Sequence, residues 1–311
     1  MADLDKWNTL ICDPVDNILI EVLRKKGLKV EYYPSINTDE LSSSINRFHI
    51  VVVRSRTKLT SEILSKASNL KIIARAGIGT DNIDVEYANK AGISIVTAAG
   101  SSTHSVAELS ISLMIMLARN LFSQIDLTKK GVWEKSNGME LYGKTAGIIG
   151  LGRIGFATAM ILSSMGMNLI AYDPIVNKEF IERLHFNYVD RNTLLSKSDV
   201  LFIMANLTGQ GKNMLSTEHF DIMKDKVLIV NTSRPEFING KDLLKALKSG
   251  KIGGYASDVF WHEPPVESWE KKILSMKNVI VTPHIGAQTA EAQKKVAEYT
   301  LNNLFKKIEE M

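Results

Sequence analysis

Short apolar runs rich in Val and Ile alternate with amphipathic stretches along almost the whole chain. Apolar runs bounded by turn residues predict buried strands, and apolar positions that recur every three or four residues predict helices. A regular alternation of the two is typical of parallel sheets joined by crossover helices. We therefore predict an α/β protein built from two doubly wound parallel sheets, each formed by one series of alternations.

The first series lies in the N-terminal part of the chain. Its predicted strands are at residues 9–12, 29–33, 50–54, 71–74 and 93–97. The helical patterns between them are at residues 16–26, 38–45, 60–67 and 84–91. Together they predict one small doubly wound unit.

The second series begins after an apolar helical stretch at residues 105–121. Its predicted strands are at residues 145–149, 168–172, 200–204, 227–231, 253–257 and 279–282. Six parallel strands match a dinucleotide-binding sheet. A last helical pattern at 288–307 has no strand after it, so we expect it to cross back onto the first unit. Residues 1–99 and 287–311 should then form one domain, with residues 100–286 inserted as a second.

A glycine-rich turn joins the first strand of the second series to a helix. Gly150 permits a tight turn, Gly152 lets the backbone approach a pyrophosphate, and Gly155 lets the helix pack against the strand. The N–H groups at the start of that helix would face the anion. The next strand ends in Asp173, 18 residues after Gly155, about where a ribose-binding acid belongs. No arginine follows Asp173 directly, so we predict NAD as the cofactor in preference to NADP.

Three polar residues follow later strands of this series, at the end of the sheet where ligands bind. His284 can exchange a hydroxyl proton, and Glu263 can orient its ring and favour the imidazolium. Arg234 can hold a carboxylate bidentately and polarise the neighbouring carbonyl group. Taken singly, each is more often a solvated or packed residue. Together they predict a hydride-transfer site.

Nearly the whole chain resembles the D-isomer-specific 2-hydroxyacid dehydrogenase family. The matching segments are residues 75–84, 105–109, 150–155 with Asp173, 231–234, 257–260 with Glu263 and Pro264, and 282–286. The resemblance implies a Rossmann NAD-binding domain inserted into a flavodoxin-like substrate domain. It implies catalytic roles for Arg234, Glu263 and His284.

The resemblance also implies the ligand contacts. The residues that match cofactor-binding positions are Gly150, Gly152, Arg153, Ile154, Gly155, Asp173, Ala205, Thr232, Ser233, Asp258, His284 and Gly286, with Asp258 on the nicotinamide amide. The residues that match substrate-binding positions are Arg54, Ser55, Arg75, Ala76, Gly77, Gly79 and Arg234. No metal site is predicted.

Within the family, residues 51–60 and the Arg75 form of the substrate loop are most similar to the D-3-phosphoglycerate dehydrogenases. Arg54, Ser55 and Arg56 lie at the end of an inner strand of the first series. Two arginines and a hydroxyl suit the phosphate of a substrate whose other end lies at Arg234, Glu263 and His284. We therefore expect oxidation of D-3-phosphoglycerate to 3-phosphohydroxypyruvate, a step of serine biosynthesis. A glyoxylate or hydroxypyruvate reductase is the alternative, and an NADH-sensing scaffold with little turnover is another. Longer relatives append a serine-sensing domain, and feedback by that route is not expected here.

Two segments depart from the family pattern. Residues 204–207 read Met-Ala-Asn-Leu where a histidine and a proline are common, and Pro235 follows the predicted catalytic arginine. Pro235 has no N–H and restricts the residue before it, which favours an altered substrate preference or rate.

The other histidines compete for the acid–base role. His262 is the chief rival, but it adjoins Glu263, so the two side chains should point apart. Structural or surface roles suit His49, His185 and His219, whereas His104, just before the apolar helical stretch, could reach a ligand.

Composition limits the class of protein and its partners. Hydrophobic residues make up 45% of the chain and charged residues 23%, with a formal net charge of +4. That charge is too small for a nucleic-acid surface but compatible with a small anionic substrate. No leader pattern is visible, and no apolar run approaches the roughly 18 residues that span a bilayer, so we expect no membrane partner. The single cysteine, Cys12, favours a reducing compartment, and we predict a cytoplasmic protein.

The apolar stretch at residues 105–121 also bears on assembly. Its apolar residues cover nearly all faces of the predicted helix, more than one packed stripe requires. The excess should be buried against a second copy, so we expect a homodimer through the NAD-binding domain. A helix buried wholly within the monomer is the alternative.

Overall fold

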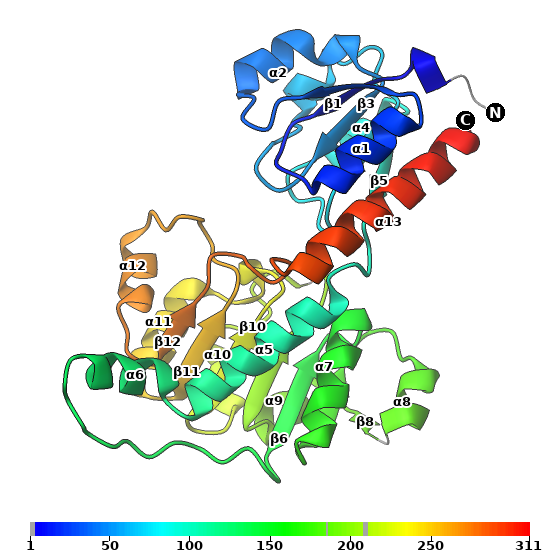
Figure 1. The fold of residues 1–311 in the computed structure, drawn as a ribbon. Helices are drawn as coiled ribbons and strands as arrows, with labels where there is room; N and C mark the ends of the chain where they lie inside the picture. Colours follow the sequence, from blue (N-terminus) through cyan, green and yellow to red (C-terminus); the bar gives the residue numbers. More distant parts are fainter. Residues whose placement is uncertain (1–3, 185, 208–210) are drawn as a thin grey trace. The chain divides into compact units, whose positions relative to one another are not determined.

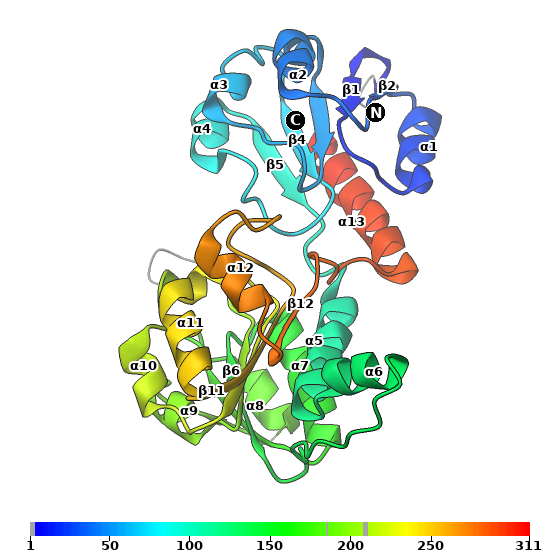
Figure 2. The same ribbon diagram turned by 90° about the vertical axis from the view of Figure 1, so that its left-hand side faces the viewer.

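The computed structural model describes residues 4–184, 186–207 and 211–311 of the chain. The chain divides into two compact units. The first combines residues 1–102 with residues 288–311, and the second is the continuous stretch 103–287. Figure 1 and Figure 2 show the elements of both units in two views.

The described residues of the first unit form a five-stranded parallel sheet with the strand order β2-β1-β3-β4-β5. The strands are β1 (Asn8–Ile11), β2 (Lys29–Tyr32), β3 (Ile50–Val53), β4 (Ile72–Arg75) and β5 (Ser94–Thr97). The helical elements are η1 (Leu4–Lys6), α1 (Asn17–Lys25), α2 (Thr38–Ser44), η2 (Ile45–Arg47), α3 (Ser61–Leu64), α4 (Val85–Lys90) and α13 (Ala290–Glu309). This strand order is the flavodoxin-like one, as the sequence predicted.

Helices cover both faces of this sheet, which explains why its central strand β3 is apolar at every position. Ile50 and Val52 pack with α1 and α13, whereas Val51 and Val53 pack with α2, α3 and α4. α13 lies against α1 and β5 (Figure 1). Its Leu301, Leu304 and Ile308 belong to the same core as Ile50 and Val52. The expectation that the last helix packs on the first unit is confirmed.

The described residues of the second unit form a seven-stranded parallel sheet with the order β12-β11-β10-β9-β6-β7-β8. The strands are β6 (Thr145–Ile149), β7 (Asn168–Tyr172), β8 (Asn187–Tyr188), β9 (Val200–Ile203), β10 (Val227–Asn231), β11 (Ile252–Ser257) and β12 (Val279–Val281). The helical elements are α5 (Thr103–Ala118), α6 (Leu121–Lys129), α7 (Arg153–Ser164), α8 (Lys178–Leu184), α9 (Arg191–Lys197), α10 (Thr217–Ile222), η4 (Pro235–Phe237), α11 (Gly240–Ser249) and α12 (Ser268–Leu274).

The strand order of the second unit is that of a dinucleotide-binding sheet with one strand added. All six predicted strands are present, and the prediction missed β8. This strand has two residues at the sheet edge, beside β7, and is too short to leave a period in the sequence. α5 and α7 pack on one face of the sheet, and α9, α10, α11 and α12 pack on the other (Figure 2). The order reverses between β6 and β9, where ligands bind in open sheets.

α5 is buried more fully within the unit than the sequence suggested. Eight of its 16 residues are buried, because the helix contacts β10, β11, α6 and α7. Much of its apolar surface is therefore covered within the unit, and the expected homodimer stays a prediction. Among the described residues, no single helix is long and apolar enough to cross a membrane. α5 and α6 are long and apolar enough only when they are counted together, and the chain bends by 67° between them.

Candidate active site

The turn between β6 and α7 has the geometry of an anion cradle. Gly150 has a φ of +90°, and a Cβ there would lie 2.4 Å from the Cα of Ala205. A Cβ on Gly155 would lie 2.2 Å from the carbonyl oxygen of Gly150. By contrast, a Cβ on Gly152 would meet no atom of the described chain within 4 Å. Packing therefore requires glycine at 150 and 155, whereas the open space at Gly152 leaves room for a ligand.

The first turn of α7 supplies donors to the same place. α7 begins at Arg153, and no side chain among the described residues caps its N-terminus. The N–H groups of a first helical turn have no partner within the helix and carry its positive dipole end. The predicted turn residues Arg153 and Ile154 are the first two of this helix. The donor set and the open space at Gly152 fit a pyrophosphate.

Asp173 follows β7 and lies beside the glycine turn. Its Oδ2 accepts the N–H of Leu151 at 2.8 Å, and its Oδ1 accepts the N–H of Ile175 at 2.8 Å. These two bonds fix the carboxylate and leave acceptor positions open, since a carboxylate has about four. The predicted ribose-binding acid is therefore held next to the predicted pyrophosphate cradle.

His284 and Glu263 form a hydrogen-bonded pair after β12 and β11. Nδ1 of His284 lies 3.1 Å from Oε2 of Glu263, and Oε1 of Glu263 accepts the N–H of Phe260 at 3.1 Å. Because an ionised carboxylate can only accept, Nδ1 carries the proton and Nε2 is left for a ligand. The side chains are 50% and 44% exposed, so a small molecule can reach them.

The pair shifts the pKa of both groups. The hydrogen bond with Glu263 raises the pKa of His284 above its ordinary value, although burial lowers it. The charges of Glu263 and Asp258 raise it further, and the charge of Arg234 opposes them. Burial alone would raise the pKa of Glu263, but His284, the N–H of Phe260 and the charge of Arg234 outweigh it and lower that pKa. Glu263 is therefore ionised near neutral pH, and His284 keeps its proton to a higher pH than a free histidine does.

Asp258 organises the turn that carries His284. Its carboxylate is buried and accepts hydrogen bonds from Oγ1 of Thr282 at 2.5 Å, the N–H of Ile285 at 2.8 Å and the N–H of Gly286 at 2.7 Å. His284 itself has a φ of +55°, which is uncommon outside glycine. Asp258 thus holds the residues on both sides of an unusual backbone position. Its predicted contact with the nicotinamide amide stays a prediction.

Arg234 lies between β10 and η4. Its positive charge lowers the pKa of both His284 and Glu263. Its backbone is extended, with a φ of −135° and a ψ of 139°, which a following proline favours. Pro235 opens η4, where a backbone N–H would have no partner within the helix. The side chain of Asn231 donates to the carbonyl of Arg234 at 2.9 Å. The departure at Pro235 therefore fits the local backbone without the loss of a helical hydrogen bond.

Further predicted cofactor residues lie at neighbouring strand ends. The hydroxyl of Ser233 donates a short hydrogen bond to the carbonyl of Ala205. Oγ1 of Thr232 lies 2.9 Å from Oγ of Ser110 on α5. These contacts join the end of β10 to the end of β9 and to α5. The departure at residues 204–207 runs up to residues 208–210, which lie outside the described part of the chain.

In the first unit, Asp13 organises the segment after β3, a role that sequence reasoning missed. Its carboxylate is buried and accepts the N–H of Arg54 at 2.5 Å and the hydroxyl of Thr57 at 2.7 Å. Nε of Arg56 lies 3.0 Å from the same carboxylate. The available signal was an acid two residues after β1, since strand ends in such sheets carry functional groups.

The two arginines expected to meet a phosphate differ in their surroundings. Besides Asp13, the guanidinium of Arg56 binds three carbonyl oxygens, those of Cys12 at 2.5 Å, Pro34 at 3.0 Å and Ile36 at 3.1 Å. These contacts tie together the loops after β1, β2 and β3. Most donors of Arg56 therefore hold the unit together, and its expected contribution to a phosphate site stays a prediction.

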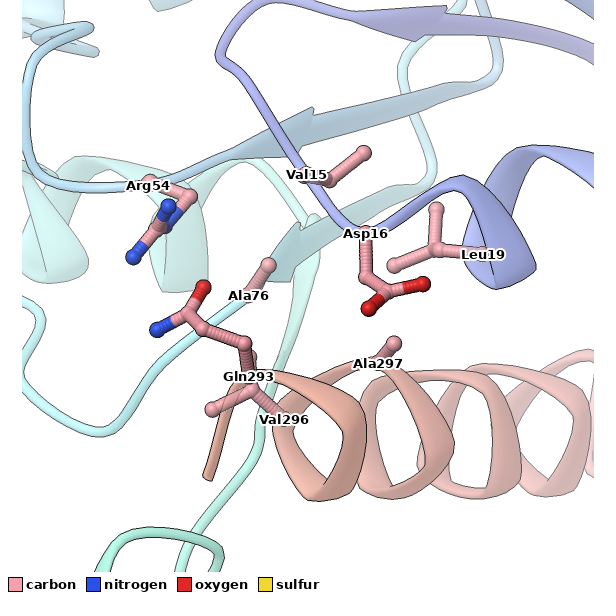
Figure 3. Close-up of a pocket in the computed structure, with 8 residues that line it drawn as sticks. All are labelled: Val15, Asp16, Leu19, Arg54, Ala76, Gln293, Val296 and Ala297. Carbon is pink, nitrogen blue, oxygen red and sulfur yellow. The ribbon is translucent and has the colours of Figure 1, made fainter. Parts of the chain in front are cut away.

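Arg54 is placed differently. Among the described residues its guanidinium makes one hydrogen bond, to the carbonyl of Pro14 at 3.2 Å. The side chain lines a small pocket of the first unit, together with Ala76 and Gln293 (Figure 3). Burial lowers the pKa of Arg54 below its ordinary value, and the charge of Asp13 opposes that shift. Ser55 is exposed beside it.

The predicted carboxylate loop follows β4. Gly77 has a φ of +155°, which other residues rarely adopt, and a Cβ there would displace the end of the Arg75 side chain, since Nη1 lies 1.6 Å away. The N–H of Ala76 donates to the carbonyl of Val53 at 2.8 Å, and the N–H of Gly77 donates to the carbonyl of Arg75 at 2.7 Å. Within the described part of the chain, the N–H groups of Ile78 and Gly79 have no partner. These two donors are the ones left open to a substrate carboxylate.

The rival histidines have other partners. Nδ1 of His262 lies 2.9 Å from Oε1 of Glu270, so His262 and Glu263 point apart as expected. His49 accepts the N–H of Asn8 at 3.1 Å, and His219 bonds within the cap of α10. His185 lies outside the described residues. His284 is therefore the histidine paired with Glu263 and acted on by Arg234.

Residues 111–286, more than half of the chain, match the model of a known family domain, the D-isomer specific 2-hydroxyacid dehydrogenase NAD binding domain. The chain belongs to this family. The resemblance seen in the sequence is confirmed, and with it the NAD-binding fold of the second unit.

Relatives within the 2-hydroxyacid dehydrogenase family carry several names. D-3-phosphoglycerate dehydrogenase of Archaeoglobus fulgidus is 41% identical over 92% of this chain and 54% of its own length. Hydroxypyruvate reductase of Thermotoga maritima is 40% identical over 97% of this chain and 99% of its own length. The structure of D-lactate dehydrogenase from Aquifex aeolicus with NAD and lactic acid superposes with a TM-score of 0.86 at 27% identity, covering 97% and 95% of the two chains. This chain spans about half the length of the first curated relatives that it matches.

Proposed function

We propose that this 2-hydroxyacid dehydrogenase interconverts a D-2-hydroxy acid and its 2-oxo acid, with D-3-phosphoglycerate as the first candidate substrate. Bound NAD would supply the hydride acceptor for C2 of the hydroxy acid, and NADH the hydride donor for the reverse reaction. The observation that carries the proposal is the His284–Glu263 pair, with Arg234 beside it, after the strands of a dinucleotide-binding sheet. The cradle at Gly152 and the acid Asp173 support NAD as the cofactor.

In this proposal His284 moves the proton of the reaction. In oxidation, Nε2 of His284 accepts the hydroxyl proton, while its Nδ1–H stays hydrogen-bonded to Glu263. The negative charge of Glu263 stabilises the imidazolium that forms. In reduction, the same Nε2–H protonates the oxygen that becomes the hydroxyl. Arg234 holds the carboxylate and polarises the carbonyl group. Open N–H groups at Ile78 and Gly79 are further donors for the carboxylate.

Two observations support a phosphorylated substrate. The guanidinium of Arg54 keeps most of its five donors open within the described chain, and a guanidinium binds phosphate oxygens in its own plane. Two relatives, at 41% and 42% identity, bear the name D-3-phosphoglycerate dehydrogenase. We therefore assign Arg54, with the hydroxyl of Ser55, to the phosphate.

Hydroxypyruvate or glyoxylate reduction is the second candidate, and one observation favours it. The relative from Thermotoga maritima named hydroxypyruvate reductase matches over nearly its full length, whereas the phosphoglycerate dehydrogenases match over about half of theirs.

A steady-state screen tests the proposal. Purified protein is assayed with NADH against 3-phosphohydroxypyruvate, hydroxypyruvate, glyoxylate and pyruvate, and with NAD against the corresponding D-hydroxy acids. The highest kcat/KM is expected for the phosphorylated pair. A preference for hydroxypyruvate or glyoxylate would favour the second candidate, and no turnover with any acid would contradict both.

Cofactor choice gives a direct prediction for Asp173. The carboxylate should accept hydrogen bonds from the ribose hydroxyls and repel a 2′-phosphate, so wild type should prefer NAD. Replacing Asp173 with Ala removes both effects, and the ratio of kcat/KM for NAD to that for NADP should fall. A wild-type ratio at or below one, or a ratio unchanged in Asp173→Ala, would contradict this reading.

The pH profile of turnover should depend on Glu263. Glu263→Gln keeps the shape of the side chain but removes the charge that raises the pKa of His284. In that variant the pKa of His284 should fall, so the limb of the pH–rate profile that His284 controls should move to lower pH. The direction is the same for oxidation, which needs neutral His284, and for reduction, which needs protonated His284. Profiles of kcat/KM in both directions measure the shift, and a limb that stays in place would contradict the pairing.

We also propose a homodimer and a cytoplasmic location. Exposed apolar residues occur along residues 121–142, namely Phe122, Ile125, Trp133 and Tyr142, and Trp133 is 84% exposed. We expect sedimentation at micromolar concentration to give a dimer that Trp133→Ser weakens and Tyr33→Ser, an exposed aromatic of the first unit, does not. A wild-type monomer would contradict the dimer.

The proposed cytoplasmic location rests on the sole cysteine, Cys12, which is buried and supports a reducing compartment.

A further inference from the structure

A buried carboxylate in the second unit lies outside the groups that the proposed reaction uses. Glu270, on α12, is 0% exposed, whereas the neighbouring acids Glu263 and Glu267 are exposed. Burial of an ionised carboxylate is unfavourable unless hydrogen bonds compensate for the lost water. The partners of Glu270 therefore show what holds it and what it holds.

Glu270 accepts three hydrogen bonds from one short loop. Oε1 lies 2.9 Å from Nδ1 of His262, and Oε2 accepts the N–H of Val266 at 3.0 Å and that of Glu267 at 2.8 Å. Burial alone would raise the pKa of Glu270, but these bonds and the nearby His262 outweigh it and lower that pKa. The carboxylate is therefore ionised, and all three donors point to it.

The three donors bracket Glu263. His262 directly precedes Glu263, and Val266 and Glu267 follow it closely. Residues 262–267 belong to no described helix or strand, so this loop has no regular hydrogen-bond ladder to fix its shape. One buried carboxylate joins its two ends instead.

The helix that carries Glu270 is itself well anchored. Ile273 on α12 is fully buried, and the ring of Trp269 meets that of Trp261 edge to face with centroids 5.0 Å apart. The indole N–H of Trp261 donates to the carbonyl of Ile238 at 3.2 Å. Glu270 therefore presents its carboxylate from a rigid support.

We propose that Glu270 is a positioning residue: by closing the loop 262–267 it sets the place of the Glu263 carboxylate against His284. This proposal deepens the proposed function and rests on it for its consequence in turnover. Glu270 touches neither His284 nor Glu263 in any described contact, so it acts through the backbone of the loop. Loss of its charge should free the loop and weaken the Glu263–His284 hydrogen bond.

The test measures the pKa of His284 directly, without turnover. The chain has six histidines, so labelled imidazole signals followed by NMR across a pH titration are few, and the His284 signal is identified by its loss in His284→Asn. In Glu270→Gln we expect the pKa of His284 to fall by at least half as much as in Glu263→Gln. The matched control is Glu267→Gln, which removes an exposed carboxylate from the same segment and should leave that pKa unchanged.

A double variant separates positioning from general loosening. If Glu270 acts through Glu263, Glu270→Gln should cause no further fall of the His284 pKa in a Glu263→Gln background. An additive fall in the double variant, or a wild-type titration in folded Glu270→Gln, would overturn the proposal. Should Glu270→Gln fail to fold, His262→Asn is the second variant. It removes one of the three hydrogen bonds to Glu270 by changing an exposed side chain. It should lower the His284 pKa less but in the same direction, and an unchanged pKa there would overturn the proposal.

Turnover of the same variants separates the two proposals. With an active wild type, Glu270→Gln should lower kcat and shift the pH limb while the Kd for NADH stays the same. A wild type that turns over none of the acids, but whose His284 titrates as expected in all variants, would contradict the proposed function and support the positioning role.

Discussion

Replacing His284 with Asn should lower kcat by about 10²–10⁴-fold, the usual contribution of general acid–base catalysis. Among the described residues, His284 is the histidine that pairs with Glu263, and the rival His262 bonds Glu270 instead. The Kd for NADH, measured by fluorescence titration, should change little, because the glycine turn and Asp173 are untouched.

His262→Asn is the matched control for this loss. Its ring bonds Glu270 and acts on the pair only through the loop, so kcat should fall far less than in His284→Asn. Near wild-type turnover in His284→Asn, combined with its loss in His262→Asn, would reverse the assignment of the acid–base residue.

Replacing Arg54 with Ala should lower kcat/KM for 3-phosphohydroxypyruvate by about ten- to a hundredfold, as expected from the loss of charge-assisted hydrogen bonds worth roughly 1.5–3 kcal/mol each. Glyoxylate, which has no phosphate, should show little change. The backbone around Arg54 should survive the substitution, because Asp13 binds the N–H of residue 54 and not its guanidinium. The ratio of the two kcat/KM values in wild type and variant measures the effect.

Arg56→Ala provides the contrast. Its guanidinium holds the carboxylate of Asp13 and three carbonyl oxygens, so its loss should lower the melting temperature and affect both substrates alike. Equal losses for the two substrates in Arg54→Ala, or a wild-type preference for glyoxylate, would favour a glyoxylate reductase over a phosphoglycerate dehydrogenase.

Strands such as β3, β9 and β10 were predictable because each is an apolar run buried on both faces of a parallel sheet. β3 shows the rule, since its four consecutive apolar residues serve two separate cores. β8 escaped prediction because two residues at an edge carry no periodicity. The α5 stretch was misread in part, since its apolar faces meet several neighbours within one unit.

Arg234, Glu263 and His284 could be selected from the sequence because parallel strand ends meet at one edge of a sheet. The residues that hold the site in shape could not. Asp13 meets residues 54–57, more than forty positions away, and an isolated carboxylate gives no sign of such partners. Glu270 resembles an exposed acid of a short helix in the sequence, and only the fold shows that it is buried. The carbonyl partners of Arg56 could not be predicted for the same reason, because backbone oxygens leave no mark on composition.

The interrupted layout of the first unit has a consequence for the order in which the chain can fold during synthesis. Residues 103–287 form a continuous unit with its own core, and all of them leave the ribosome before α13 does. Until then, the face of the first sheet formed by Ile50 and Val52 lacks the cover of Leu301 and Leu304. The nucleotide-binding unit can therefore be complete while the earlier-made unit still exposes an apolar surface. That surface is where a chaperone would bind the nascent chain, and where a truncated chain without α13 would aggregate.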